Sequence, residues 1–219
     1  MELKDKHKGE VIAILGNGPS LKEADKSLIA TMTTIGINAS PVFFDSDYLI
    51  MLDKTTVENR IKLVRRSRSI PFLPFPTGLL DEYHTYTNYQ PRKHESQLSS
   101  DIKDGLRWSN TSIMPAINLA YVMGARAVIL FGLDMNANNH FYKEKKKHVN
   151  DKYNVEFPNI ETIYKDFVSV QHWIKEKNID FTIFNANSNS FIRCFRFCKV
   201  SGQFLRKLIR RRYILKGCI

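Results

Sequence analysis

An apolar strand followed by a glycine turn near the start of the chain constrains the fold most. Residues 11–15 read Val-Ile-Ala-Ile-Leu, a run typical of a strand buried in a parallel sheet. Gly16 and Gly18 permit a sharp turn, while Pro19 and Ser20 suit the first turn of a helix. Such a turn aims free backbone N–H groups and the positive end of a helix dipole at one spot. The motif therefore predicts either a phosphate-binding turn or a plain tight turn.

Apolar runs alternate with helix-like segments along the rest of the chain. This alternation predicts an α/β fold, a Rossmann-like and mostly parallel sheet with helices on both faces. We expect strands at 11–15, 34–38, 48–52, 69–72, 127–131 and 181–184, and helices at 20–30, 55–66, 114–123 and 160–177. The polar stretches at about 73–110 and 136–159 lack this pattern, and we expect lid-like insertions there.

Small, amide and carboxylate residues recur where the predicted strands end. In open parallel sheets, ligands bind beyond the carboxyl ends of the strands. The recurrence favours a ligand site over a plain turn. The strand ends carry Gly16-Asn17-Gly18, Asn38, Asp53, Gly132-Leu133-Asp134 and Asn185-Ala186-Asn187.

The positive charge of the chain is concentrated at its C-terminus. Residues 191–219 hold nine of the 33 Lys and Arg residues and no acid, whereas residues 1–190 carry a net charge of only +2. Apolar residues recur at helical spacing from Phe191 to Ile209. We therefore divide the chain into one domain at 1–190 and a basic amphipathic tail at 191–219. The tail suits an anionic membrane surface; a helix packed on the domain and a nucleic-acid-binding segment are the alternatives.

Cysteine usage and the termini predict the compartment. The only cysteines are Cys194, Cys198 and Cys218, so no disulfide framework is indicated. The polar N-terminus has no signal-peptide core, and no apolar run is long enough to span a bilayer. We expect a cytoplasmic protein, peripheral on the inner face of the plasma membrane.

The motifs together resemble a known group of enzymes. The motif Gly-Asn-Gly-Pro-Ser-Leu-Lys-Glu at 16–23, Asn38, and Thr111-Ser112 before an apolar helix, Gly124 and Gly132-Leu133-Asp134 look like the bacterial lipooligosaccharide sialyltransferases. The order is also similar to that of lipopolysaccharide-core Kdo transferases. A third similar group is the Rossmann-like relatives of the archaeal hydroxymethylpterin pyrophosphokinase. The resemblance covers residues 10–190, and it implies that 1–190 is a Rossmann-like nucleotide-sugar-binding domain.

The resemblance implies an inverting transfer of a sugar from a CMP-activated donor, with no metal or other cofactor required. It implies nucleotide or donor contacts at Gly16, Asn17, Gly18, Ser20, Asn38, Asp53, Thr111, Ser112, Gly132 and Asp134. Tyr142 falls near a tyrosine that supports the leaving phosphate in that family. The chain departs from the family at Asp53, Ser109 and Ile113, where the family has asparagine, arginine and glycine, and the family's catalytic histidine has no clear counterpart.

The acceptor hydroxyl also needs a base, and His140 is our candidate. A histidine suits this role because its ordinary pKa lies near neutrality, although a plain surface-loop histidine is the simpler interpretation. Asp45 and Asp47 match the DxD pattern of metal-dependent glycosyltransferases, but they also suit the turn before a strand. We expect no metal at the site.

The sequence thus predicts a glycosyltransferase that moves sialic acid or Kdo from its CMP donor to a cell-surface glycan, glycolipid or lipopolysaccharide acceptor. One alternative is a pyrophosphokinase-like enzyme that uses Mg²⁺. Another is a non-enzymatic module that binds a nucleotide or a nucleic acid. Nucleic acid is the less favoured partner, because the aromatic residues of the tail fall on its apolar face.

Overall fold

The computed structural model describes residues 3–89, 96–135 and 160–210 of the 219-residue chain. Its centre is an eight-stranded sheet in the order β10-β9-β8-β1-β2-β3-β4-β5, and each strand pairing in these ranges is parallel. The strands are β1 (Val11–Leu15), β2 (Thr33–Ile37), β3 (Tyr48–Ile50), β4 (Ile70–Leu73), β5 (His84–Thr85), β8 (Ala127–Phe131), β9 (Thr182–Asn185) and β10 (Arg196–Phe197). A separate parallel pair joins β6 (Asn88–Tyr89) to β7 (Leu106–Arg107).

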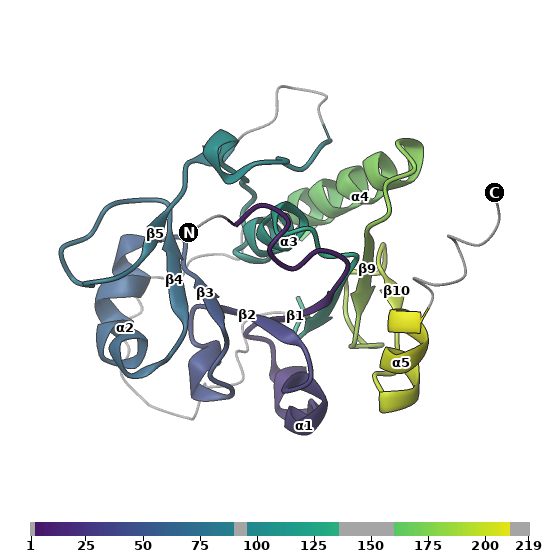
Figure 1. The fold of residues 1–219 in the computed structure, drawn as a ribbon, viewed down its shortest axis with the longest axis horizontal. Coiled ribbons are helices and arrows are strands. Elements are labelled where there is room, and N and C mark those ends of the chain that lie inside the picture. The colour runs from purple at the N-terminus through teal and green to yellow at the C-terminus, as the bar shows by residue number, and fades with distance from the viewer. Residues whose placement is uncertain (1–2, 90–95, 136–159, 211–219) are drawn as a thin grey trace.

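Helices cover both faces of this sheet, as predicted (Figure 1). On one face lie α3 (Ile113–Val122) and α4 (Ile160–Glu176), and on the other lie α1 (Lys26–Ile29), α2 (Lys54–Arg66) and α5 (Gly202–Arg210). Short 3-10 helices are η1 (Pro19–Glu23), η2 (Ser40–Val42) and η3 (Ile102–Asp104). The predicted α/β fold with a basic amphipathic C-terminal helix is confirmed.

The two faces of the sheet have separate cores because side chains alternate along each strand. Ile12 and Ile14 pack toward α3 and α4, while Ala13 and Leu15 pack toward α1 and α5. All five residues of β1 are buried, which explains why this strand reads as a continuous apolar run. The core also takes in α3, whose buried residues surround the helix.

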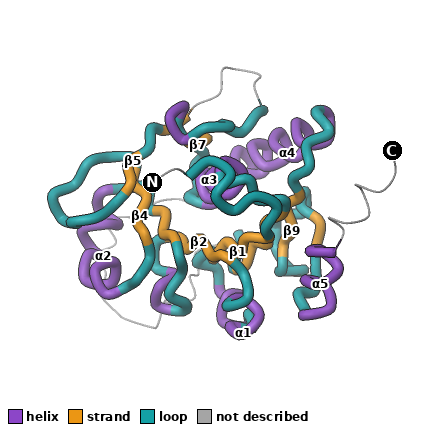
Figure 2. Tube along the Cα trace, in the orientation of Figure 1, coloured by secondary structure: helices purple, strands orange, loops and turns teal. Residues whose placement is uncertain are grey.

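Two expectations about local structure were wrong. The helix expected at 20–30 is broken into η1 and α1, because Asp25 leaves the helical conformation to cap α1 through Ser27 N. Residues 191–201 do not continue a helix, since residues 196–197 pair with β9 as β10. The stretch at 73–110 is mostly loop (Figure 2), but it also contains β5, β6, η3 and β7.

Candidate functional site

The carboxyl ends of β1, β2, β8 and β9 meet at one edge of the sheet, as the parallel order requires. The loops that follow these strands supply Asn17 and Ser20, Asn38, Asp134, and Asn187. The structure therefore brings together most of the residues that the strand-end pattern singled out, although they come from segments far apart in the sequence.

Glycines let the loops after β1 and β8 touch. Gly16 N donates to Phe131 O at 2.8 Å, and Gly18 N donates to Gly132 O at 2.9 Å. A Cβ on Gly16 would lie 2.6 Å from Gly132 O, closer than real Cβ contacts allow. Gly132 itself has φ +67°, a conformation that side chains rarely adopt. The glycines of the first motif thus serve loop-to-loop packing.

Asp134 joins three of the strand-end loops. Its carboxylate accepts a hydrogen bond from Ser20 Oγ at 2.7 Å and longer ones from Ser20 N at 3.3 and 3.4 Å. On the other side it accepts from Asn187 Nδ2 at 3.0 Å. Its backbone oxygen accepts from Phe191 N at 3.1 Å. Asp134 therefore holds the β1 loop against the loop that follows β9.

Burial raises the pKa of Asp134 above its ordinary value, because the charged carboxylate loses water. Hydrogen bonds from Ser20 oppose this rise, nearby Glu23 adds to it, and the bond from Asn187 opposes it. The side chain is only 5% exposed, so the hydrogen bonds that stabilise its charge come from the protein.

Three N–H groups of the turn at 16–20, which the first motif was expected to leave free, are already paired. Gly16 N and Gly18 N donate to the β8 segment, and Ser20 N donates to Asp134. The anion at the start of η1 is thus the Asp134 carboxylate of the protein itself. The turn can still form one wall of a site, but its backbone does not offer these donors to a phosphate.

Two buried amide oxygens at this edge have no protein partner within the described ranges, Asn17 Oδ1 and Asn38 Oδ1. Asn17 Nδ2 donates to Ile37 O at 3.1 Å, which fixes the amide of Asn17 beside the end of β2. Asn38 has φ +50°, a conformation that asparagine tolerates better than most residues. Since a buried acceptor without a donor costs free energy, the two oxygens are suited to a ligand that donates hydrogen bonds.

The N-terminus of α3 lies at the same edge. Gly124, just after α3, accepts a hydrogen bond from Gly9 N beside the start of β1, so the helix runs from the carboxyl edge toward the amino edge. Ser112 precedes the helix and makes no capping hydrogen bond with its side chain, while Thr111 Oγ1 accepts from Ile113 N at 3.3 Å. Ile113 N is therefore already paired, and Pro115 has no N–H. The helix favours an anion at this end mainly through its dipole.

Asp53 has a structural role at the start of α2. Its carboxylate accepts hydrogen bonds from Thr56 N at 2.6 Å and Thr56 Oγ1 at 2.7 Å. It lies at the carboxyl end of β3, two strands from β1. The predicted nucleotide contact at this residue would compete with these hydrogen bonds.

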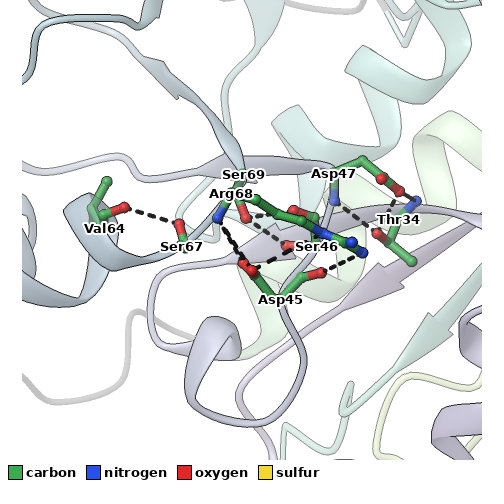
Figure 3. Close-up of polar contacts among 8 residues, drawn as sticks. All are labelled: Thr34, Asp45, Ser46, Asp47, Val64, Ser67, Arg68 and Ser69. Atoms are coloured by element: carbon green, nitrogen blue, oxygen red, sulfur yellow. Dashed lines mark hydrogen bonds and ion pairs between the residues drawn. The ribbon is translucent and has the colours of Figure 1, made fainter.

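Asp45 and Asp47 lie at the opposite edge of the sheet, before β3 begins (Figure 3). Asp47 accepts hydrogen bonds from Thr34 N at 2.9 Å and Thr34 Oγ1 at 2.7 Å. Asp45 accepts two from Arg68 N, at 3.1 and 3.2 Å. Both carboxylates therefore fix backbone turns, and the DxD interpretation is not supported.

His140 and Tyr142, the predicted catalytic residues, lie outside the described residues. The histidines within the described ranges are placed away from the strand-end cluster. His7 contacts Glu10 and Tyr48, His84 stacks on Phe72, and His172 is exposed on α4.

Two polar residues that the sequence analysis left without a role prove important. Asn187 completes the Asp134 cluster, and its position after a predicted strand was the signal that could have identified it. Asn118, fully buried on α3, accepts from Ser99 N and Arg107 N at 3.0 and 2.7 Å and donates to Ser99 O at 2.7 Å. It ties the segment before α3 to the helix, and a single amide in an apolar helix was its only sequence signal.

This arrangement defines an α/β protein in which polar residues cluster where the parallel strands end. A scan against protein-family models found no match, and a sequence search of curated proteins found none. No helix within residues 3–89, 96–135 and 160–210 is long and apolar enough to cross a membrane.

Solved glycosyltransferases share the fold. The MAf glycosyltransferase of Magnetospirillum magneticum matches with a TM-score of 0.59 and 14% identity, over 95% of this chain and 38% of that one. The sialyltransferase CstII of Campylobacter jejuni, in complex with the substrate analogue cytidine-5′-monophosphate, gives 0.53 and 15%, over 87% and 85%. A Cst-II variant in complex with CMP gives 0.51 and 14%, over 85% of each chain. The chain thus spans about two fifths of the Magnetospirillum protein, and the likeness establishes a shared fold.

Proposed function

We propose that the chain is a glycosyltransferase that takes a sugar of the sialic acid or Kdo type from a CMP-activated donor. The acceptor would be a hydroxyl group on a cell-surface glycan, glycolipid or lipopolysaccharide. One observation carries this proposal: the strand-end site, with two buried amide oxygens that have no protein partner in the described residues, sits in a fold shared with sialyltransferases solved with CMP.

The two kinds of group at the site suit the two parts of a nucleotide. The N-terminus of α3, with Thr111 and Ser112, would hold the phosphate through N–H and hydroxyl donors. Asn17 Oδ1 and Asn38 Oδ1 would accept hydrogen bonds from the amino or hydroxyl groups of the nucleoside. Asp134 would act as a positioning residue, because its oxygens already accept from Ser20 and Asn187.

In the proposed reaction, the bond between the anomeric carbon and the phosphate oxygen breaks, and CMP leaves with the electron pair. The acceptor oxygen forms the new bond to that carbon and gives its proton to a base. We propose His140 as the base and Tyr142 as the support of the leaving phosphate. The scheme calls for no cofactor beyond the donor. The Mg²⁺-dependent pyrophosphokinase-like alternative is not favoured, since Asp45 and Asp47 fix turns at the opposite edge.

Nucleotide binding gives the first test. Thermal melts with CMP, CDP, UDP, GDP and ATP, with and without Mg²⁺, should show a rise for CMP that does not need the metal. A ligand at 100 times its dissociation constant adds about 2.7 kcal/mol to the free energy of unfolding. No response to any cytidine nucleotide would refute the proposed donor, and a response to ATP only with Mg²⁺ would favour the alternative.

A pair of asparagine variants tests the site itself. Asn38→Gly removes the amide while keeping a residue that tolerates positive φ. Its matched control is Asn178→Gly, at an exposed asparagine with φ +49° that follows α4 at the far edge of the sheet. We expect Asn38→Gly to weaken CMP binding at least about tenfold, the value of one lost hydrogen bond to a buried acceptor. Equal CMP affinity in the two variants would remove Asn38 from the site.

The base is tested separately from binding. His140→Ala should abolish transfer of the sugar while CMP binding survives. Retained turnover would rule out this role for His140, and a joint loss of CMP binding would place the residue in the donor site instead.

A further inference from the structure

Exposed apolar side chains gather in the C-terminal basic segment, which we define as residues 191–210. Three of the five exposed large hydrophobic residues in the described part of the chain lie there: Phe191 is 61% exposed, Phe197 50% and Ile209 57%. A single exposed apolar residue is ordinary, but three in a segment of 20 residues can each offer an apolar contact to a partner surface.

The same segment is strongly positive. It contains six Lys or Arg residues and no acid, so no carboxylate within it neutralises the charge. Five of these side chains are exposed, namely Arg193, Arg196, Lys199, Arg206 and Lys207. A surface that combines cations with exposed aromatic and aliphatic groups matches the chemistry of an anionic lipid surface.

Packing determines how α5 can use its charge. Leu205 is buried, and the ring of Phe204 meets that of Phe184 edge-on, with centroids 5.5 Å apart. The apolar stripe of α5 is therefore occupied by the sheet and cannot enter a bilayer as a free amphipathic helix would. Arg206 and Lys207 remain exposed on this fixed helix. Contact with lipid would thus be mainly electrostatic, with shallow insertion of the exposed apolar residues.

The segment forms one end of the molecule and adjoins the strand-end site. β10 is the last strand of the described sheet, and α5 lies at the same end of the molecule (Figure 1). Phe191 lies at the start of the segment, and its backbone N–H donates to Asp134 O at 3.1 Å. A molecule docked through this end would hold the strand-end site close to the surface of the bilayer.

We propose that the C-terminal basic segment docks the protein on an anionic lipid bilayer. The proposal stands apart from the transferase activity, because binding to lipid vesicles needs neither donor nor acceptor. A double-stranded nucleic acid is also polyanionic, but its phosphates would contact the cations and not the exposed Phe191, Phe197 and Ile209.

Vesicle co-sedimentation of the full chain tests the proposal. Vesicles of phosphatidylcholine with added phosphatidylglycerol should bind the protein, pure phosphatidylcholine vesicles should not, and salt should weaken the binding. The double variant Arg206→Glu/Lys207→Glu should bind the anionic vesicles at least about tenfold more weakly, since each cation near such a surface contributes about 1 kcal/mol. The matched control is Lys62→Glu/Arg66→Glu, at two exposed cations of α2, at the other end of the sheet.

Three results would overturn the proposal: equal binding to neutral and anionic vesicles, equal losses in the two double variants, or displacement from vesicles by duplex DNA that binds more tightly than the lipid. The melting temperature of each variant checks that it folds. If the α5 variant does not, Arg193→Glu/Arg196→Glu replaces it, because both residues are exposed outside the helix.

Discussion

Replacing Gly18 with alanine should test how closely the loops after β1 and β8 pack, because the change adds a side chain without straining the backbone. Gly18 has φ −69° and ψ 157°, which alanine adopts without strain. The added Cβ, however, would overlap the Asp134 carboxylate and would lie 2.7 Å from Gly132 O. Asp134 could move away only by giving up its hydrogen bonds from Ser20, and the contact with the Gly132 backbone would remain.

The expected loss of stability has two contributions, the steric overlap of the new Cβ and the hydrogen bonds that Asp134 gives up. Overpacking of this kind costs about 1–3 kcal/mol, and a hydrogen bond to a charged group contributes about 1.5–3 kcal/mol. We therefore expect the free energy of unfolding to fall by about 2.5–6 kcal/mol. For a chain of this length that corresponds to a drop of about 5–24 °C in melting temperature.

Calorimetry of Gly18→Ala beside Gly78→Ala checks the reasoning. A Cβ on Gly78 meets nothing within 4 Å, so this control should melt at or slightly above the wild-type temperature. CMP binding should weaken in Gly18→Ala alone, because the loop that carries Asn17 must shift. If Gly18→Ala has the same melting temperature as Gly78→Ala, the loops after β1 and β8 do not pack as closely as the structure has them.

Three further outcomes are expected. Asn118→Ala should lower the free energy of unfolding by about 2–4 kcal/mol in urea denaturation, because it leaves the N–H of Ser99 buried without its partner; a loss below 1 kcal/mol would contradict this. Asp53→Ala should cost about 1 kcal/mol as a lost helix cap at Thr56 N, and a calorimetric titration that shows no loss of CMP affinity would confine Asp53 to that role. Burial raises the pKa of Asp134, so the folded protein binds a proton at higher pH than the unfolded chain does. The stability linked to that proton is therefore present at low pH and is lost as the pH rises through the raised pKa. The free energy of unfolding of the wild type should therefore rise relative to that of Asp134→Asn as the pH is lowered toward 4. A fall relative to the variant would contradict the raised pKa.

Local patterns in the sequence were sufficient for most of the fold. Buried parallel strands expose neither face to water, so β1 and β8 are recognisable as continuous apolar runs, and β8 has the predicted bounds. The amphipathic spacing of α4 likewise predicted its buried residues Ile163, Phe167, Val170 and Ile174. The rule that parallel strands end together then placed the candidate site before any contact was known.

Contacts across the chain decided what these patterns could not. Residues 194–198 have helical spacing, but pairing with the open edge of β9 made 196–197 a strand, since an unpaired edge offers backbone partners. Asp45 and Asp47 look like a metal motif until Thr34 and Arg68 supply their donors.

The first motif shows the division most clearly. The sequence by itself determined that a strand, a sharp glycine turn and a short helix would follow one another at 11–23, because these depend on neighbouring residues. Only the tertiary structure decided what meets that helix start: Asp134, 114 residues away, fills the position expected for a ligand anion. The reason is physical, since a backbone N–H takes the nearest acceptor that folding brings to it, and burial makes a missing acceptor costly.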